Sequence, residues 1–297
     1  MTATMDRASE PLVTVLMPVY NAAAAARSIL ADPVPDLELL VVDDGSTDRS
    51  MAELGEIADP RIRVVRQPNA DLVAALNRGL EEARGTNLAR MDGDDLSVPG
   101  RIASQVRWLE AHPDAVACGT DYEMFGALAG RVRLPRGDRA CRQRLLLGSC
   151  HCGASVVMRR DVIVRGALRF DPAYQHAEDY EFFTRLSRHG ALGNIPMVGY
   201  RYRMHPGQVS AQYAHLQRSA HLRVAARHAE RVGLPVLSDD VVGRLLWPAA
   251  QSVPRTAVST AGAAVRAFRR RPGIETARFT GRKVVEATLL AAKNPVA

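Results

Sequence analysis

Short apolar runs alternate with helix-forming segments along the first part of the chain. Three such runs occupy residues 12–17, 37–42 and 62–67, and a fourth covers residues 87–92. The segments between them are helix-forming, most clearly residues 71–85, which end at a glycine. Short apolar runs bounded by turn residues are typical of buried parallel strands. The repeated strand–helix order predicts an α/β fold with a doubly wound, mostly parallel sheet flanked by helices.

The pattern changes further along the chain. After residue 208, Ala- and Arg-rich helical segments follow one another and are broken by glycine and proline. We therefore place a domain boundary near residue 210, with an α/β domain over residues 11–210 and a basic α-helical C-terminal extension over residues 211–297. The elements expected before the boundary are a helix over 99–111, strands near 115–119 and over 154–158, a helix over 179–189 and a strand over 198–204.

Polar clusters follow three of the first four predicted strands. The carboxyl ends of parallel strands meet at one edge of a sheet, so we expect these clusters to face a common crevice. The clusters are Pro18-Val19-Tyr20-Asn21, Asp43-Asp44-Gly45-Ser46 and Asp92-Gly93-Asp94-Asp95.

The composition is that of a globular protein, with 47% hydrophobic and 24% charged residues. It excludes a disordered, collagen-like or disulfide-scaffold chain. Lys283 and Lys293 are the only lysines among 39 basic residues. The main body therefore lacks the lysine of a phosphate-binding loop, a Schiff base or a kinase site, and phosphate must be bound by arginine, histidine, a metal or backbone amides.

The charge is unevenly distributed along the chain. Residues 211–297 hold 12 Arg and 2 Lys against 5 acidic residues, a net of +9, so the total of +7 leaves −2 for residues 1–210. This distribution argues against a nucleic-acid partner for the α/β domain. It is compatible with peripheral contact between the C-terminal region and an anionic membrane surface, or with an ordinary solvated helix face.

The cysteines and the start of the chain indicate a cytoplasmic protein, peripheral at most to the inner face of the plasma membrane. The first residues, MTATMDRASEP, lack the basic and then apolar order of a secretory signal. Cys150-His151-Cys152 lacks the second ligand pair of a structural zinc site, so we expect reduced thiols there. The most apolar long stretch, residues 245–265, contains Arg255 and two prolines. We expect no membrane span.

The sequence Asp92-Gly93-Asp94 places two carboxylates directly after a buried strand. Mg²⁺ and Mn²⁺ are typically held by one or two carboxylates while phosphate oxygens complete the coordination. Asp and Gly are also ordinary turn residues. Because three acids in four residues repel one another without a cation, we favour the metal interpretation over the turn.

Three further positions each have a functional and a purely structural interpretation. Asp43 and Asp44 can accept a hydrogen bond from a nucleobase or cap the following helix. Asp179, after Glu178, can be a general base or a helix N-cap. His205 can be a metal or phosphate ligand or an ordinary strand-end histidine.

Seven short motifs occur in a fixed order along the chain. They are Pro18-Val19-Tyr20-Asn21, residues 42–48 (VDDGSTD), residues 75–80 (ALNRGL), residues 89–95 (ARMDGDD), Pro99-x-Arg101, Glu178-Asp179 and Tyr202-Arg203-Met204-His205. The ordered set closely resembles the family 2 glycosyltransferases of GT-A, Rossmann-like fold. The resemblance covers about residues 11–210, and the set is specific although each motif alone is not.

The resemblance implies an inverting glycosyltransferase that moves a sugar from a nucleotide-diphosphate sugar, foremost a UDP-sugar, to a glycan or lipid-linked acceptor in cell-envelope or exopolysaccharide synthesis. It implies Mg²⁺ or Mn²⁺ as cofactor, held by Asp92, Asp94 and His205, and Asp179 as the catalytic base. The residues implied to bind the nucleotide sugar are Pro18, Tyr20, Asn21, Asp43, Asp44, Asn77, Asp92, Gly93, Asp94, Arg101 and Glu178.

Two departures and two alternatives accompany the resemblance. Asp71 stands where relatives usually have glycine, which puts the nucleotide-loop geometry in doubt, and Gly93 replaces a common alanine without expected harm. A haloacid-dehalogenase-like phosphatase also uses strand-end aspartates but needs a lysine that residues 1–282 lack. A non-catalytic nucleotide-sugar-binding module of the same fold is the stronger alternative.

Overall fold

Nine strands in the described part of the chain form one sheet. The computed structural model describes residues 11–21, 24–34, 36–205, 207–208, 212–247, 253–270 and 272–293. The sheet order is β3-β2-β1-β4-β8-β6-β9-β5, and β7 pairs with β6. The strands are β1 (Val13–Val19), β2 (Leu37–Asp43), β3 (Ile62–Arg66), β4 (Asn87–Arg90), β5 (Leu96–Ser97), β6 (Ala115–Gly126), β7 (Gly130–Val132), β8 (Val157–Arg159) and β9 (Ala191–Met204).

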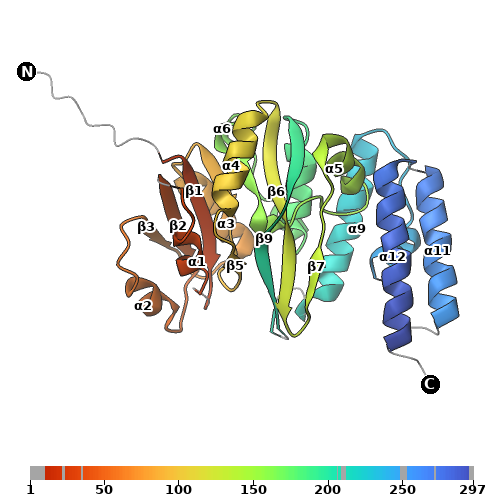
Figure 1. The fold of residues 1–297 in the computed structure, drawn as a ribbon, viewed down its shortest axis with the longest axis horizontal. Helices are drawn as coiled ribbons and strands as arrows, with labels where there is room; N and C mark the ends of the chain where they lie inside the picture. The colour runs from red at the N-terminus through yellow and green to blue at the C-terminus, as the bar shows by residue number, and fades with distance from the viewer. Residues whose placement is uncertain are drawn as a thin grey trace, which may run out of the picture.

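The first four strands are parallel, and the remainder of the sheet is mixed. β1 pairs in parallel with both β2 and β4, and β2 pairs in parallel with β3. β8 runs antiparallel to β4 and β6, whereas β6 and β9 are parallel. The parallel half brings the carboxyl ends of β1, β2 and β4 to one edge, and the long β6–β9 pair extends the sheet away from them (Figure 1).

Helices cover both faces of the sheet. The helices from the C-terminal part of the chain lie beyond the β6–β7 side of the sheet (Figure 1). They are α1 (Ala26–Leu30), α2 (Ser50–Gly55), α3 (Leu72–Glu82), α4 (Arg101–Ala111), α5 (Gly137–Leu145), α6 (Arg160–Arg165), α7 (Glu178–Leu186), α9 (Ala214–Arg231), α10 (Asp239–Leu246), α11 (Val253–Arg270) and α12 (Ile274–Lys293). Two short 3₁₀ turns, Gly153–Ser155 and Pro172–Tyr174, lie between them.

Every residue of β1 is buried, because the strand packs against helices on both faces. Leu16 belongs to the apolar core under α3, α5, α6, α7 and α9, whereas Val15 and Met17 belong to the core under α1, α2 and α4. This division follows from the alternation of side chains along a strand. A Cβ on Gly79 of α3 would lie 2.0 Å from Leu16 Cδ1, so glycine is what lets α3 approach β1 this closely.

Asp71 begins α3 as its N-cap. Its Oδ1 accepts a hydrogen bond of 2.7 Å from Ala74 N, and its Oδ2 accepts one of 3.1 Å from Gln175 Nε2. An N-cap aspartate satisfies a free amide of the first helical turn. The aspartate at position 71 therefore has a local structural role, because its two carboxylate oxygens anchor the loop before α3.

The region after residue 210 is joined to the α/β body. Ala220, Val224 and Ala225 of α9 are buried in the same core as β1, α3 and α7. The helices α10, α11 and α12 share a third apolar core, which also includes Leu147 from the body. Within the described ranges, none of the helices combines the length and apolarity that crossing a bilayer requires.

Candidate active site

A cavity of about 630 Å³ opens at the carboxyl ends of β1, β2 and β4. This is the position at which α/β sheets of this kind bind ligands. The predicted site residues that line it are Pro18, Tyr20, Asp44, Asp92, Gly93, Asp94 and Glu178.

The loops after β1 and β2 are fastened to each other at the rim of the cavity. Asn21 N donates to Ser46 Oγ at 3.1 Å, and Asn21 Oδ1 accepts from Thr47 N at 2.9 Å. Asn21 itself adopts a left-handed backbone conformation, with φ of 54°, which asparagine tolerates better than most residues. The predicted binding residue Asn21 therefore sets the shape of this rim and does not itself line the cavity.

Asp43 and Asp44 have different positions. Asp43 Oδ1 accepts from Ser46 N at 2.9 Å, and its Oδ2 lies 3.7 Å from Arg66 Nε, so its carboxylate closes the turn after β2. Asp44 lines the cavity, and its Oδ1 accepts from Gln67 Nε2 at 2.7 Å and from Ala70 N at 3.0 Å. Of the two aspartates, Asp44 alone is a cavity-wall residue.

The loop after β4 is held by Asp95, which is 1% exposed. Its Oδ2 accepts from the hydroxyl of Tyr200 at 2.5 Å, and its Oδ1 accepts from Arg203 N at 2.6 Å. Arg203 Nε also donates to the carbonyl of Asp94 at 2.8 Å. Burial raises the pKa of Asp95 to about 7, against these hydrogen bonds. Asp95 thus ties the loop to β9, which leaves Asp92 and Asp94 to face the cavity.

Asp94 and His205, predicted from distant motifs, lie together. Asp94 Oδ2 is 3.3 Å from His205 Nε2, and the two side chains are 42% and 38% exposed. In the part of the chain that the structure describes, no three His, Cys, Asp or Glu side chains form a complete metal site. Mg²⁺ and Mn²⁺ in phosphate-binding sites use few protein ligands and take phosphate oxygens for the rest. An open carboxylate–imidazole pair at a cavity edge fits such a cation.

Arg90, at the end of β4, joins two of the predicted carboxylates. Its Nη1 forms an ion pair with Asp179 Oδ1, and its Nη2 lies 3.1 Å from Asp92 Oδ1. The guanidinium side chain is only 3% exposed. Burial by itself would lower the pKa of Arg90, but the charges of Asp179, Asp92 and Glu178 outweigh it and raise the pKa. Burial raises the pKa of Asp92, and Arg90 opposes that rise.

Asp179 lies in the first turn of α7 and is not its cap. The N-cap residue is Ala177, which makes no side-chain capping bond. The interpretation of Asp179 as an N-cap is therefore wrong. Its second oxygen, Oδ2, lies over Gly153, where a Cβ would approach it to 1.7 Å. The carboxylate is 24% exposed, one oxygen held by Arg90 and the other directed over a glycine.

Glu178 lines the cavity beside Asp179. Burial raises the pKa of Glu178 to about 7, and the neighbouring charge of Asp179 adds to the rise. Its Oε2 is buried without a hydrogen-bond partner among the described residues. A carboxyl group in this state is available to donate a hydrogen bond to a bound ligand.

Six predicted site residues do not line the cavity: Asn21 and Asp43, described above, Asp179 and His205, which lie beside the lining residues Glu178 and Asp94, and Asn77 and Arg101. Asn77 Nδ2 donates to the carbonyl of Phe170 at 2.9 Å, and its Oδ1 accepts from Phe170 N at 2.8 Å. Arg101 is fully buried, with its Nε donating to Ser97 Oγ at 2.9 Å and its Nη1 near the Arg90 carbonyl. Both side chains support the elements around the site, and neither is in position to contact a diphosphate in this structure.

The structure adds residues that the sequence did not single out. Arg90 belongs to the motif of residues 89–95, but the sequence did not indicate its role. The structure shows that role through the ion pair with Asp179, which is 89 residues away in the chain. Tyr213 and Leu216, from beyond residue 210, also line the cavity. Tyr213 stacks on His176, with ring centroids 4.8 Å apart, and both residues line the cavity. An aromatic residue near the start of α9 was the only signal available for this contact.

Comparisons with known proteins show what the chain as a whole is similar to. The model of the family "Glycosyl transferase family 2" matches residues 14–165. An "Uncharacterized glycosyltransferase" of Haemophilus influenzae is 33% identical over 227 residues, covering 70% of this chain and 70% of that protein. The "Succinoglycan biosynthesis protein ExoO" of Rhizobium meliloti is 30% identical over 219 residues, covering 67% of this chain and 63% of that protein.

Two solved structures have the same fold. S. aureus TarS 1-349 in complex with UDP-GlcNAc aligns with a TM-score of 0.61 at 14% identity, over 95% of this chain and 90% of that one. The mannosyltransferase PcManGT from Pyrobaculum calidifontis, in complex with GDP-Man and Mn²⁺, aligns with a TM-score of 0.60 at 20% identity, over 97% and 89%. At these identities the likeness concerns the fold alone.

Proposed function

The chain belongs to glycosyl transferase family 2, and we propose that it is an inverting enzyme that moves a sugar from a nucleoside diphosphate sugar to an acceptor hydroxyl. The observation that carries the proposal is the arrangement around Arg90, which holds Asp179 and Asp92 at one edge of the strand-end cavity. Asp94, which also lines the cavity, lies 3.3 Å from His205 Nε2 through its Oδ2.

Asp179 is the base in this proposal. Its Oδ2 takes the proton of the acceptor hydroxyl while its Oδ1 stays paired with Arg90. The hydroxyl oxygen then bonds to the anomeric carbon as the bond from that carbon to the diphosphate breaks. Because attack and departure occur on opposite faces of the sugar, the configuration inverts. Arg90 pairs with the carboxylate and fixes its orientation.

The donor occupies the 630 Å³ cavity in this proposal. Asp44 and Tyr20 lie on the wall formed by β1 and β2, where the nucleoside binds, and Asp92, Asp94 and His205 lie toward the diphosphate. When bound, Mg²⁺ or Mn²⁺ supplies positive charge to the leaving diphosphate, and Asp94 and His205 would hold it, with Asp92 alongside. Glu178, which also lines the cavity, donates a hydrogen bond to the sugar or phosphate.

The solved neighbours support a nucleotide sugar as donor, because those two proteins are in complex with UDP-GlcNAc and GDP-Man. A role in polysaccharide synthesis is supported by the name of the Rhizobium meliloti relative. We assign the catalytic unit to residues 11–210 with α9 completing the cavity wall. The basic region that follows is proposed to make peripheral contact with an anionic membrane surface.

A panel of nucleotide sugars tests the proposal. The purified chain is incubated with each sugar nucleotide, Mn²⁺ or Mg²⁺ and candidate glycan acceptors, and nucleoside diphosphate release is followed alongside donor binding by calorimetry. Release that requires Asp179 supports the enzyme. Tight donor binding with no release of nucleoside diphosphate, whether an acceptor or only water is present, would identify a non-catalytic binding module instead.

A further inference from the structure

A second cavity, of about 480 Å³, lies between the β6–β7 hairpin, α5 and α12. Four basic residues line it, and none of its lining residues is acidic. The basic residues come from three separate segments, so the charge is gathered by the fold and not by a sequence run. They are Arg133 after β7, Arg144 of α5, and Arg282 and Lys283 of α12.

The second cavity adjoins the proposed donor cavity. Tyr202 of β9 lines both of them. Cys152 lines the second cavity and immediately precedes Gly153, over which Asp179 Oδ2 lies. The lining of the second cavity therefore reaches the residue next to the one over which the proposed base lies.

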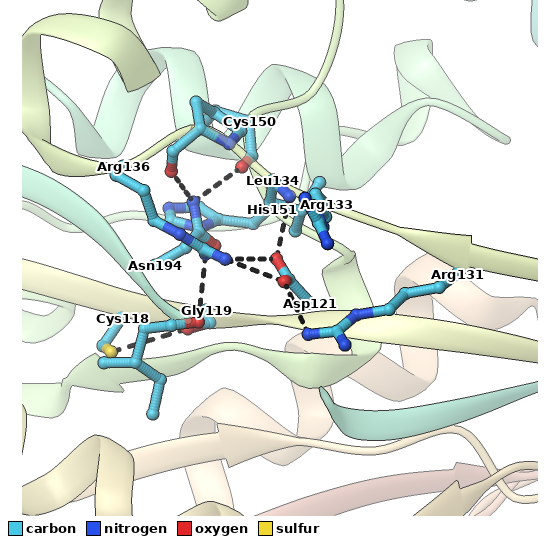
Figure 2. A network of polar contacts seen from close by, with 12 residues as sticks. Cys118, Gly119, Asp121, Arg131, Arg133, Leu134, Arg136, Cys150, His151 and Asn194 are labelled. Atoms are coloured by element: carbon cyan, nitrogen blue, oxygen red, sulfur yellow. Dashed lines mark hydrogen bonds and ion pairs between the residues drawn. The ribbon is translucent and has the colours of Figure 1, made fainter. Parts of the chain in front are cut away.

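His151 contributes a buried hydrogen-bond acceptor to the lining of the second cavity. Asn194 Nδ2 donates to the carbonyls of Pro135 and Cys150 at 2.8 and 3.1 Å, so its Oδ1 accepts from His151 Nδ1 at 2.9 Å (Figure 2). The proton of the neutral ring is then on Nδ1, which leaves a lone pair on Nε2.

His151 is 3% exposed, and its Nε2 has no partner among the described residues. Burial lowers the pKa of His151 to about 4, so the ring is neutral at pH 7. A Cβ on Gly119 would lie 2.8 Å from His151 Nδ1 and 2.2 Å from Asn194 Oδ1, so glycine makes room for the pair. The ring also packs edge-on against Phe183, with centroids 5.0 Å apart, so a ligand hydroxyl that pairs with Nε2 must enter the wall of the cavity.

Two carboxylates of β6, Asp121 and Glu123, lie close to the β6–β7 wall, and both are paired with arginines; Glu123 Oε2 lies 3.3 Å from Arg201 Nε. Asp121 Oδ1 and Oδ2 each lie 2.7 Å from Arg136 Nη2, and Leu134 N also donates to Oδ1 at 2.9 Å (Figure 2). On the opposite side, Arg282 Nη1 donates to the carbonyl of Arg133 at 3.1 Å and fastens α12 to this wall. The lining of the second cavity therefore combines four basic side chains with no acidic one.

We propose that the second cavity binds the acceptor through a phosphate or diphosphate ester, and that the acceptor's hydroxyl-bearing part extends past Cys152 to Asp179. This inference rests on the proposed function and names the chemical class of its acceptor. Arginine forks match phosphate oxygens in pairs, and several cations around one small cavity favour a multiply charged anion. The neutral His151 orients a hydroxyl of the same molecule.

The test is binding of two defined probes, glucose 1-phosphate and geranyl diphosphate, without added nucleotide, because UDP is itself a diphosphate ester and would compete for the second cavity. We compare wild type with Arg133→Gln and with the double variant Arg282→Gln/Lys283→Gln. The control is Arg278→Gln, which removes an exposed cation from the same helix α12 outside the cavity lining. The double variant and Arg133→Gln remove cations from two separate segments of the chain, so a folding defect in α12 cannot account for both.

Each variant of the lining is expected to weaken probe binding by at least about tenfold, and Arg278→Gln to leave it within twofold. Tighter binding of geranyl diphosphate indicates a lipid-linked acceptor, and tighter binding of glucose 1-phosphate a soluble phosphorylated glycan. Equal probe affinity in all four proteins overturns the proposal. UDP affinity and donor hydrolysis are measured on the same samples, so a chain that binds the probes but transfers no sugar contradicts the proposed function and not the anion site.

Discussion

Gly153→Ala tests how closely the position of Asp179 controls the reaction. An added Cβ would lie 1.7 Å from Asp179 Oδ2 and 2.8 Å from Arg90 Nη1, whereas real Cβ contacts are not closer than 3.0 Å. The carboxylate must therefore move by more than about 1 Å. A misplacement of about 1 Å at a reacting group can cost about 10²-fold in rate. We expect the turnover rate to fall by about that factor, and donor affinity to change little because Gly153 does not line the donor cavity.

The measurement compares initial rates, donor affinity by calorimetry and melting temperature for Gly153→Ala and Gly243→Ala. A Cβ on Gly243, inside α10, meets no atom within 4 Å. That control is expected to keep wild-type turnover and gain about 0.5–1 kcal/mol in stability, because alanine is the better helix former. Wild-type turnover in a folded Gly153→Ala protein would refute the assignment of the Asp179 carboxylate to the reacting position.

Three further predictions follow from other parts of the structure. Donor affinity is expected to rise with Mn²⁺ or Mg²⁺ and to lose this dependence in Asp94→Ala; calorimetry with excess chelator checks it, and equal affinity with and without metal contradicts the cation site. Burial lowers the pKa of folded His151 to about 4 against about 6.5 when unfolded, so below pH 6.5 the unfolded chain binds more protons and stability falls. Urea unfolding is expected to show that the free energy of unfolding falls between pH 7 and pH 5 by about 2 kcal/mol less in His151→Gln than in wild type. An equal fall in both proteins contradicts this prediction. Co-sedimentation with anionic vesicles at low salt is expected to exceed that with neutral ones, and equal recovery opposes membrane contact.

The first half of the fold could be predicted from the sequence because its strands are continuous apolar runs. The predicted strand over 37–42 corresponds to β2 (Leu37–Asp43), and the predicted helix over 71–85 contains α3 (Leu72–Glu82). In the second half the pattern is weaker. β9 begins at Ala191 and not at residue 198, because its first residues pair with β6 without a clear run of their own. The segment between the first two predicted strands is also helix-forming, over residues 22–30. Residues 22 and 23 of this segment lie outside the described residues, and α1 begins at Ala26.

The strand-end cluster of the candidate site was predictable for the same reason, since topology alone brings those ends together. The sequence could not rank residues within it. Asp43 and Asp44 are adjacent and chemically identical, and only the turn geometry assigns one to the backbone and the other to the cavity. Arg101 could not be distinguished from a surface cation until its burial was known. The contribution of Tyr213 depends on the packing of α9 against the body, which no local pattern encodes.

The most direct test of the central claim is turnover of Asp179→Asn. Asparagine keeps the size of the side chain but cannot take a proton, and Asp179 makes no capping bond whose loss would destabilise α7. Initial rate, donor affinity and melting temperature are measured beside wild type with the sugar nucleotide that the panel identifies. The account predicts a rate lower by about 10²- to 10⁴-fold with nearly unchanged donor affinity. Near-normal turnover in the folded variant would contradict it and transfer the role of base to Glu178.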